Sequence, residues 1–488
     1  MPESVCYAEP VRADGQPAVT LTPPASGWSR LLRAATRRTT PESLAFRREL
    51  GLSETAPVIL SGHQAEWWHA GILAKQAAMA ALCRATDADG AWVVVDQDAN
   101  NPFTLTYPAA AEGLPRRGDW TIAPESHANH ARADVALHDL PPFTPAPPPV
   151  RGATPDITRG LRAIADCTAR WSRAANAAEQ IARANAELAA SVLGASPTLI
   201  FATRILATAA GRSLLERMAG DPAACTGAYN RAVAASRLST LAPLSAAPEK
   251  GRYELPLWRL SPAGRPTPRR RVFAATLGDA PLDALAPRAL LMSALLRWLG
   301  CDLFIHGTGG GATGEEGGYD KVAEAWFREW LGVELAPSVV ATATLLLPMG
   351  AAPTVDEADL RSAHRRVEQA RHAPGTLGDD AAQRQKDDLV SRIAGSSDRR
   401  ERRRLYRALQ DHLESYRTRH SAQVEAASAD VSRTAGELAR QTILRDRTWP
   451  WPLLPRTMVL ALQRRMDAEF ALPTTSPHPP APSSPPPS

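Results

Sequence analysis

Two short apolar runs separated by a helical pattern constrain the fold of this chain more than any other feature. Residues 58–60 read Val-Ile-Leu and residues 92–95 read Trp-Val-Val-Val, and both runs are typical of buried strands. Between them, Trp68, Ile72 and Met79 recur at helical spacing. A strand, a helix and a strand within about forty residues predict a βαβ unit, and hence a parallel sheet with a right-handed crossover.

The rest of the chain divides into regions of different composition. Residues 1–56 form a Pro- and Arg-rich N-terminal segment, in which a Thr-Pro-Glu-Ser sequence predicts a short helix over 40–50. An α/β core is expected over residues 57–350, with a helical insertion at about 157–237. The sheet pattern resumes at 301–305, directly after a helix that ends at a glycine.

Residues 355–444 are highly charged and nearly free of β-branched clusters, which predicts two or three helices. An apolar stripe one helix face wide recurs there at Leu405, Leu409, Leu413 and Tyr416. So narrow a stripe suits a coiled-coil seam better than a globular core. We therefore expect a C-terminal α-helical coiled-coil arm that projects from the core and forms a homodimer. The other interpretation is a monomeric lid that folds back on the core.

Beyond the arm, residues 445–472 are expected to form a C-terminal helix that returns toward the core, and residues 473–488 a disordered Pro-rich tail. No run of eighteen apolar residues indicates a membrane span. The net charge of +5 is too weak an excess to indicate nucleic acid binding. The five cysteines are scattered without metal-binding spacing, so we expect no metal site and a cytoplasmic protein with reduced thiols.

The first candidate site follows the first predicted strand, at Gly62, His63 and Gln64. A tight turn at the glycine would expose backbone N–H groups at the start of the next helix, where the helix dipole favours an anion. His63 and Gln64 can add hydrogen bonds to a ligand, and Lys75 lies on the helix that follows. The alternative is a strand, a turn and a packed helix that bind nothing.

The second candidate site is a glycine-rich stretch. His306 ends a predicted strand, and seven glycines lie between Gly307 and Gly318, before Tyr319 and Asp320. Backbone without side chains can approach a ligand closely and expose N–H groups to it, although the stretch is not a Walker A loop. The alternative is a flexible loop of low complexity.

Polar residues at the end of the second strand make a third candidate, namely Asp96, Asp98 and Asn100. They could hold a metal, a ribose or an amine, or they could simply form a solvated turn. Because the carboxyl ends of parallel strands share one edge of the sheet, we expect His63 and His306 to face one cleft.

Three further groups of polar residues occur in the chain. Core packing and capping explain Tyr229, Asn230, Arg237, Glu254 and Trp258 better than a site does. A surface loop explains His127, His130, His138 and Asp139 better than a zinc site, because no helical pattern supports their spacing. The arginine-rich run at residues 265–271 could contact phosphate.

The order of these stretches resembles the bacillithiol-biosynthesis cysteine-adding enzyme family. That family has a strand, a Gly-Gln-Gln turn, a later glycine and a helix with a lysine, and the matching residues here are Gly62, His63, Gln64, Gly71 and Lys75. Its acidic stretch, Pro-Arg pair, glycine-rich turn and tyrosine match Asp96–Asn100, Pro287-Arg288, Phe304–Gly311 and Tyr319. The similarity covers about residues 57–350, with a histidine in place of the first turn glutamine and no histidine in the acidic stretch.

The resemblance implies a Rossmann-like parallel-sheet core with helical insertions. It also implies a ligase-like or transferase-like enzyme that joins a cysteine-like amino acid to a small anionic or sugar-bearing acceptor. Amide formation from a free carboxylate is uphill in water, so an activated acyl group or a nucleotide is needed, and ATP or ADP is the candidate cofactor. The other interpretation is a non-catalytic binding or assembly protein whose helical arm binds a partner.

The expected roles are assigned as follows. The candidate catalytic residues are His63, Gln64, Asp96, Asp98 and His306. The candidate substrate- or anion-binding residues are Gly62, Lys75, Asn100, Arg288, Gly307, Gly309, Gly310, Tyr319 and Asp320.

Overall fold

A computed structural model describes residues 17–36, 39–111, 114–149, 152–194, 196–236, 241–261, 265–308, 318–350 and 353–471. The chain divides into two compact units. The core unit comprises Met1–Ala109, Gly118–Leu347 and Arg447–Ser488, and the helical unit comprises Ala110–Arg117 and Pro348–Asp446. The predicted tail lies outside the described residues, as do Gly309, Gly310 and Arg237.

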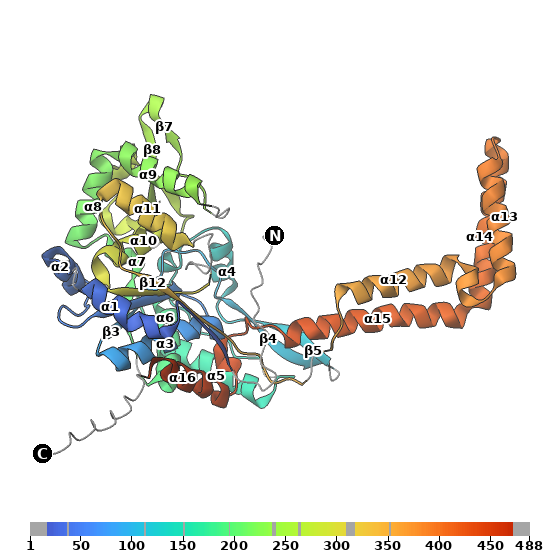
Figure 1. Cartoon of the computed structure of the whole chain (residues 1–488), viewed down its shortest axis with the longest axis horizontal. Helices are drawn as coiled ribbons and strands as arrows, with labels where there is room; N and C mark the ends of the chain where they lie inside the picture. The colour runs from blue at the N-terminus through green and yellow to red at the C-terminus, as the bar shows by residue number, and fades with distance from the viewer. Residues whose placement is uncertain are drawn as a thin grey trace, which may run out of the picture. The chain divides into compact units, whose positions relative to one another are not determined.

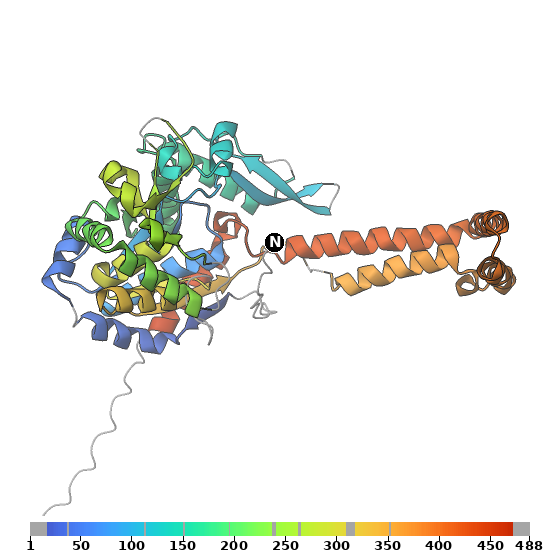
Figure 2. The same cartoon turned by 90° about the horizontal axis from the view of Figure 1, so that it is seen from above.

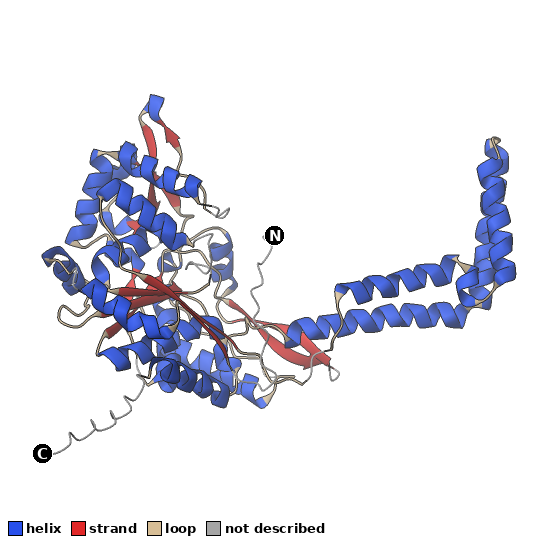
Figure 3. Ribbon diagram, viewed as in Figure 1, coloured by secondary structure: helices blue, strands red, loops and turns tan. Residues whose placement is uncertain are grey.

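The core unit is built on a six-stranded sheet (Figure 3). The strand order is β1 (Ala18–Thr22), β12 (Ser338–Thr344), β11 (Leu303–His306), β2 (Val58–Gln64), β3 (Asp89–Val95) and β6 (Thr198–Phe201). Five strands are parallel, and β1 alone pairs antiparallel, at one edge. The predicted βαβ unit is confirmed as β2, helix α3 (Ala70–Thr86) and β3.

Strand β2 is longer than predicted, which corrects the expected turn at Gly62. The strand runs through Gln64, and its register with β3 extends from Val58 opposite Asp89 to Gln64 opposite Val95. A Cβ atom at Gly62 would lie 2.5 Å from the carbonyl oxygen of Val93. The glycine therefore allows a close approach of two strands and does not form a turn.

Helices cover the two faces of the sheet (Figure 1). Helix α3 packs on one face, against β2, β3, β11 and β12. The other face belongs to a large apolar core, in which Leu60, Val93 and Phe304 of the sheet pack with Leu291 and Trp326. The helices of this second layer include α9 (Pro222–Ala235), α10 (Ala289–Leu295) and α11 (Tyr319–Leu331).

The strands that the sequence did not predict include β1, β12 and those of two further regions. The predicted helical insertion includes β6, whose Thr-Leu-Ile-Phe sequence is too short for its period to separate strand from helix. The true helices around it are α5 (Pro155–Arg170), α6 (Ala177–Leu193), α7 (Ala202–Ile205) and α8 (Ala209–Gly220). A four-stranded sheet follows, with β7 (Ala246–Ala247), β8 (Arg252–Arg259), β9 (Arg270–Phe273) and β10 (Leu285–Pro287).

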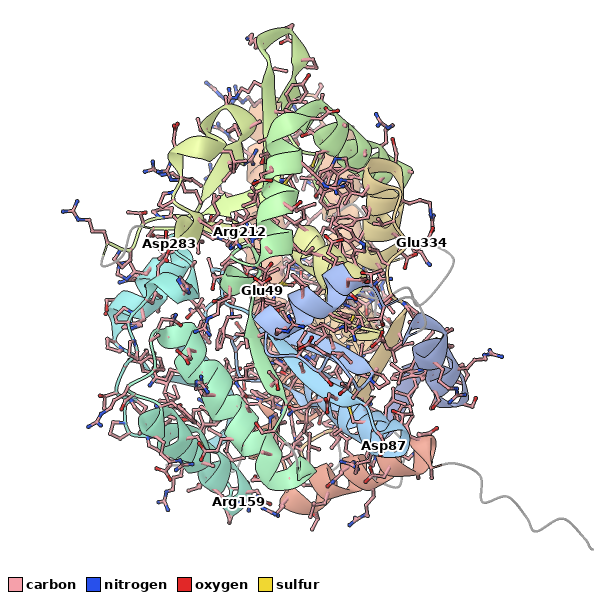
Figure 4. All side chains as sticks on the ribbon, turned by 90° about the vertical axis from the view of Figure 1, so that its left-hand side faces the viewer. Glu49, Asp87, Arg159, Arg212, Asp283 and Glu334 are labelled. Carbon is pink, nitrogen blue, oxygen red and sulfur yellow. The ribbon has the colours of Figure 1, made fainter. Side chains whose placement is uncertain are left out.

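The remaining elements lie near the chain ends and between β3 and α5. The predicted N-terminal helix is confirmed as α2 (Pro41–Glu49), capped by Thr40 and Ser43 through a reciprocal pair of hydrogen bonds. At its end, Glu49 Oε2 accepts the backbone N–H of Ala209 at 2.9 Å, which caps α8 (Figure 4). The others are α1 (Trp28–Thr36), β4 (Thr104–Ala111), β5 (Leu114–Thr121), α4 (Glu125–Arg132) and α16 (Arg456–Phe470).

The described residues of the helical unit form four α-helices, where two or three helices were expected. They are α12 (Glu357–His372), α13 (Asp380–Gly395), α14 (Arg399–Arg419) and α15 (Ser421–Leu444). Helix α12 lies beside α15, and α13 beside α14, in both views (Figures 1 and 2). No helix among the described residues is long and apolar enough to cross a membrane.

The leucine stripe of α14 has its partner within the same chain. Leu405, Leu409 and Leu413 pack against Leu389 of α13. Tyr416 is fully buried, and its hydroxyl donates to the carbonyl oxygen of Ala370 at 2.8 Å. The stripe is therefore buried within one chain and offers no exposed coiled-coil seam. The homodimer stays a prediction, but the leucine stripe no longer supports it.

Candidate functional site

The candidate site is a cavity of about 650 Å³ at the carboxyl ends of β2, β3 and β11. From β2 the chain proceeds to β3 and β6 on one side of the sheet, and later to β11 and β12 on the other. The gap between β2 and β11 is therefore a topological switch point, where open α/β sheets bind ligands. His63 and His306 both line this cavity, as predicted. Gly62, Gln64, Lys75, Asp98, Arg269, Arg288, Gly307 and Tyr319 also line it.

His63 and Gln64 occupy the last two positions of β2. The His63 Nδ1 atom lies 3.2 Å from Glu66 Oε1, and burial lowers the pKa of His63 although Glu66 opposes the shift. Gln64 Nε2 donates to Asp98 Oδ2 at 3.3 Å. Both side chains thus reach the cavity from a strand end, and neither lies at the start of α3.

One backbone N–H at the start of α3 is capped by a side chain of the same turn. His69 is the N-cap residue of this helix, and its Nδ1 atom accepts the backbone N–H of Gly71 at 3.0 Å. Burial lowers the pKa of His69 to about 4, so the ring is neutral and can accept this bond at neutral pH. Gly62 does not lie at the start of α3, and anion binding at this helix terminus stays a prediction.

Lys75 is the most perturbed cation of the cavity. Its side chain is buried, and its Nζ atom donates to the carbonyl oxygen of Gly62 at 2.5 Å. Burial lowers the pKa of Lys75 to about 7, against an ordinary value of 10.5. Within the described part of the chain, no carboxylate lies at ion-pair distance from its ammonium group. A ligand anion would supply the missing counter-charge.

His306, at the end of β11, is held by a buried acid. Its Nε2 atom lies 2.8 Å from Asp320 Oδ1, and the same carboxylate oxygen accepts from Arg297 Nη1 at 3.1 Å. Burial would raise the pKa of Asp320, but the charges of His306 and Arg297 outweigh it and hold that pKa below its usual value. Asp320 does not line the cavity, so it positions His306 and is not a substrate-binding residue.

Asp98 is the acidic group of the cavity and forms a network with Arg269. Arg269 Nη1 donates to Asp98 Oδ1 and to the carbonyl oxygen of Gln97, both at 3.0 Å. Arg269 Nη2 also contacts Asp134 Oδ1 at 2.5 Å. The guanidinium lies over the ring of Trp258, 4.7 Å from its centroid. The Asp98 carboxylate is thus held in place by Arg269 where it lines the cavity.

Arg288 also lines the cavity and also lies over the ring of Trp258. Its Nη2 atom donates to the buried carboxylate of Glu254 at 2.6 Å, and its guanidinium lies 4.2 Å from the centroid of Trp258. Glu254 and Trp258, predicted as packing residues, therefore position the two arginines of the site. The backbone N–H of Arg288 donates to Pro256 at 3.0 Å, which ties the residue to β8.

Asp96 and Asn100 do not line the cavity, which corrects their predicted roles. Asp96 is buried, and its two carboxylate oxygens accept the backbone N–H and the hydroxyl of Thr203 at 3.0 and 2.6 Å. His138 approaches the same carboxylate at 3.4 Å. Asn100 donates to the carbonyl oxygen of Ala65 and so holds the loop after β2. Both side chains are structural.

Sequence reasoning missed Arg269 and Trp258, although the arginine run at 265–271 gave a signal for the first. The predicted surface loop is wrong for His127 and His130, because both lie in helix α4, where His127 packs against Phe103 and Phe143. No group of three potential metal ligands forms among the residues that the structure describes.

No protein-family model matches the sequence, and no curated protein matches it.

Proposed function

We propose that this protein is an enzyme that joins an amine-bearing, cysteine-like amino acid to a small anionic or sugar-bearing acceptor. The observation that carries the proposal is one cavity at a topological switch point that contains three cations, one fixed carboxylate and two histidines. A carbon–nitrogen ligase or transferase needs this set, because it must hold an anion, an amine and a transferable proton together.

Three cations would bind the anionic part of the substrates. Lys75 has no carboxylate partner among the described residues, whereas Arg288 is held in place by Glu254 and Arg269 by Asp98 and Asp134. Such paired arginines keep further N–H groups for a ligand, since each guanidinium has five. Asp98 is the group that would bind the substrate ammonium, because its carboxylate lines the same cavity.

His306 would accept the proton that the amine loses when it becomes a nucleophile. A histidine held by a buried carboxylate has one nitrogen fixed and the other available for proton transfer. Lys75, with its pKa near 7, is the second group in the cavity that can exchange a proton at neutral pH.

The cation set also fits the phosphates of ATP or ADP. Lys75 and Arg288 would hold them, and a bound nucleotide would supply the phosphate that activates a carboxylate. We propose a cytoplasmic location for this chemistry, since the described cysteines at 83, 167, 225 and 301 are all free thiols.

One observation favours the alternative of a non-catalytic binding protein. Asp96, predicted as catalytic, is directed at Thr203 and away from the cavity, so only one acid of the predicted pair remains in the site. A binding protein would need the cations but no group that transfers a proton.

Calorimetry with the full chain separates the two functions. We expect heats of binding for cysteine and for ADP, and release of phosphate when ATP, cysteine and an acceptor sugar acid are mixed. The matched control is Asp320→Asn, which should retain the heats and lose the turnover, because Asp320 lies outside the cavity and positions His306. Thermal melting checks that this variant is folded, because Asp320 also pairs with the buried Arg297. Binding without turnover in both proteins would favour the binding protein, and an absence of heats would reject both functions.

A further inference from the structure

A second cavity lies at the opposite edge of the sheet, where the strands begin. It has a volume of about 380 Å³ and is formed by the first residues of β2, β3 and β6 together with one stripe of α3. The stripe consists of Gln76, Met79, Ala80 and Cys83, which recur at helical spacing. Nothing in the proposed reaction uses this cavity.

Gln76 is the unusual member of this stripe. Its side chain is 1% exposed, and within the described part of the chain neither its Oε1 nor its Nε2 atom has a hydrogen-bond partner. Buried amides are normally paired, because an unpaired donor or acceptor keeps the full penalty of leaving water. The donor and the acceptor of this amide are thus both unpaired, in a residue that lines a cavity.

A comparison within the same chain shows what a satisfied buried glutamine looks like. Gln180 is also fully buried, but its Nε2 atom donates to the carbonyl oxygens of Phe143 and Thr168 at 2.7 and 2.9 Å. Its Oε1 atom accepts the backbone N–H of Phe143 at 2.9 Å. Gln180 uses its amide to join segments of the protein, whereas Gln76 leaves the same donor and acceptor for something else.

We infer that this cavity binds a small ligand that presents an adjacent donor and acceptor, such as a primary carboxamide or the edge of a nucleobase. Gln76 can form a two-bond pair with such an edge, as glutamine does with adenine. A carboxylate ligand fits this amide less well, because it offers no hydrogen-bond donor to Oε1, and the two charged residues that line the cavity, Arg84 and Asp89, have opposite signs. Leu52, Val58 and Met79 provide apolar walls for a flat ring.

Small residues keep this space open. A Cβ atom at Gly90 would lie 3.2 Å from Cys83 Sγ and 3.3 Å from Met79 Cγ, so any side chain there would press on the stripe. Gly51, Ala80 and Ala91 also line the cavity and fill little of it. The cavity is therefore shaped by residues that leave room beside Gln76.

The test uses ligand-detected saturation-transfer NMR on the full chain with nicotinamide and with adenine, and N,N-dimethylnicotinamide as the matched probe without donors. We expect the two amide-edge probes to bind and the dimethyl probe to bind at least about tenfold more weakly, the loss set by one unmade hydrogen-bond pair. Nicotinamide should also protect Cys83 from a neutral thiol reagent, read by mass spectrometry of that peptide.

Two variants test whether Gln76 is the residue that binds the amide probes. Gln76→Met keeps the volume of the side chain and should abolish binding without lowering the melting temperature, because it removes two unpaired polar atoms. Gln180→Met should lower the melting temperature and leave binding unchanged. Equal binding of both nicotinamides, unchanged binding in Gln76→Met, or no binding of any probe would overturn the inference. The last result would mean that the amide contacts water only.

Discussion

The two ends of one sheet treat polar side chains in opposite ways. At the carboxyl edge, the arginines and the acid of the cavity are each held by a partner, as in the Arg288–Glu254 pair. At the amino edge, Gln76 is buried with an open amide. Pairing within the chain fixes the geometry of the cavity arginines, whereas Gln76, and Lys75 with no carboxylate partner among the described residues, are the positions where we expect a partner from outside.

Arg297→Met should have the largest effect, because the carboxyl edge depends on this buried cation. Arg297 is fully buried and bonds to Asp320 and Glu324, so its removal leaves the buried Asp320 with His306 alone and Glu324 with the exposed Lys321 alone. We expect the free energy of unfolding to fall by about 3–5 kcal/mol in urea denaturation. The control is Arg328→Met on the surface, whose pair with Glu334 should be worth no more than about 1 kcal/mol. Similar losses in the two variants would contradict this difference between buried and exposed pairs.

Lys75→Met should weaken the binding of an anionic substrate by about tenfold to a hundredfold, the value of a hydrogen bond to a charged group. Stability should not fall, because the variant removes a buried cation that has no carboxylate partner among the described residues. Calorimetry with ADP and thermal melting measure the two effects. A folded variant with unchanged affinity would show that Lys75 serves only to hold Gly62.

The pH dependence of stability should show whether burial perturbs Lys75. The folded-state pKa of Lys75 is near 7 and the unfolded value is near 10.5, so the unfolded chain binds more protons between these values. The free energy of unfolding should therefore rise with pH through this window, relative to Lys75→Met at each pH. Affinity for an anion should change in the opposite direction, because the ammonium form is lost above pH 7. Parallel stability curves for the two proteins would mean that the lysine is not perturbed.

His63→Ala should have the smallest effect on the fold. The ring lies at a strand end, partly exposed, and contacts Glu66 at 3.2 Å. We expect a stability change of no more than about 1 kcal/mol, measured in urea, together with weaker binding of ligands in the cavity. A larger loss of stability with unchanged binding would assign the histidine to packing.

The sequence predicted the sheet where apolar runs were long enough, and failed where local pattern was ambiguous. The run before Gly62 and the run at 92–95 identified β2 and β3 and so placed both histidines at one edge. The four residues of β6 could not be separated from a helix, because their pairing with β3 is a long-range contact. The role of Gly62 also depends on a neighbouring strand, which no local rule contains.

The site was predictable only in part for the same reason. Lys75 and His306 follow directly from the βαβ order, whereas Arg269 reaches Asp98 across 171 residues of sequence. Asp96 and Asp98 are two positions apart in a polar stretch. Asp96 bonds to Thr203, which is distant in sequence, whereas Asp98 lines the cavity. Sequence spacing identifies which strand end carries polar groups, and tertiary packing decides which of those groups a ligand can meet.

Helix α3 has a further consequence, because consecutive residues of it line the two cavities. Lys75 lines the first cavity and Gln76 the second, on a helix that packs directly against four strands of the sheet. A ligand that shifted this helix would alter the Lys75–Gly62 contact, and occupancy of one cavity would then change affinity at the other. Thermodynamic linkage makes such an effect reciprocal: the factor by which an amide ligand changes anion binding equals the factor by which the anion changes amide binding.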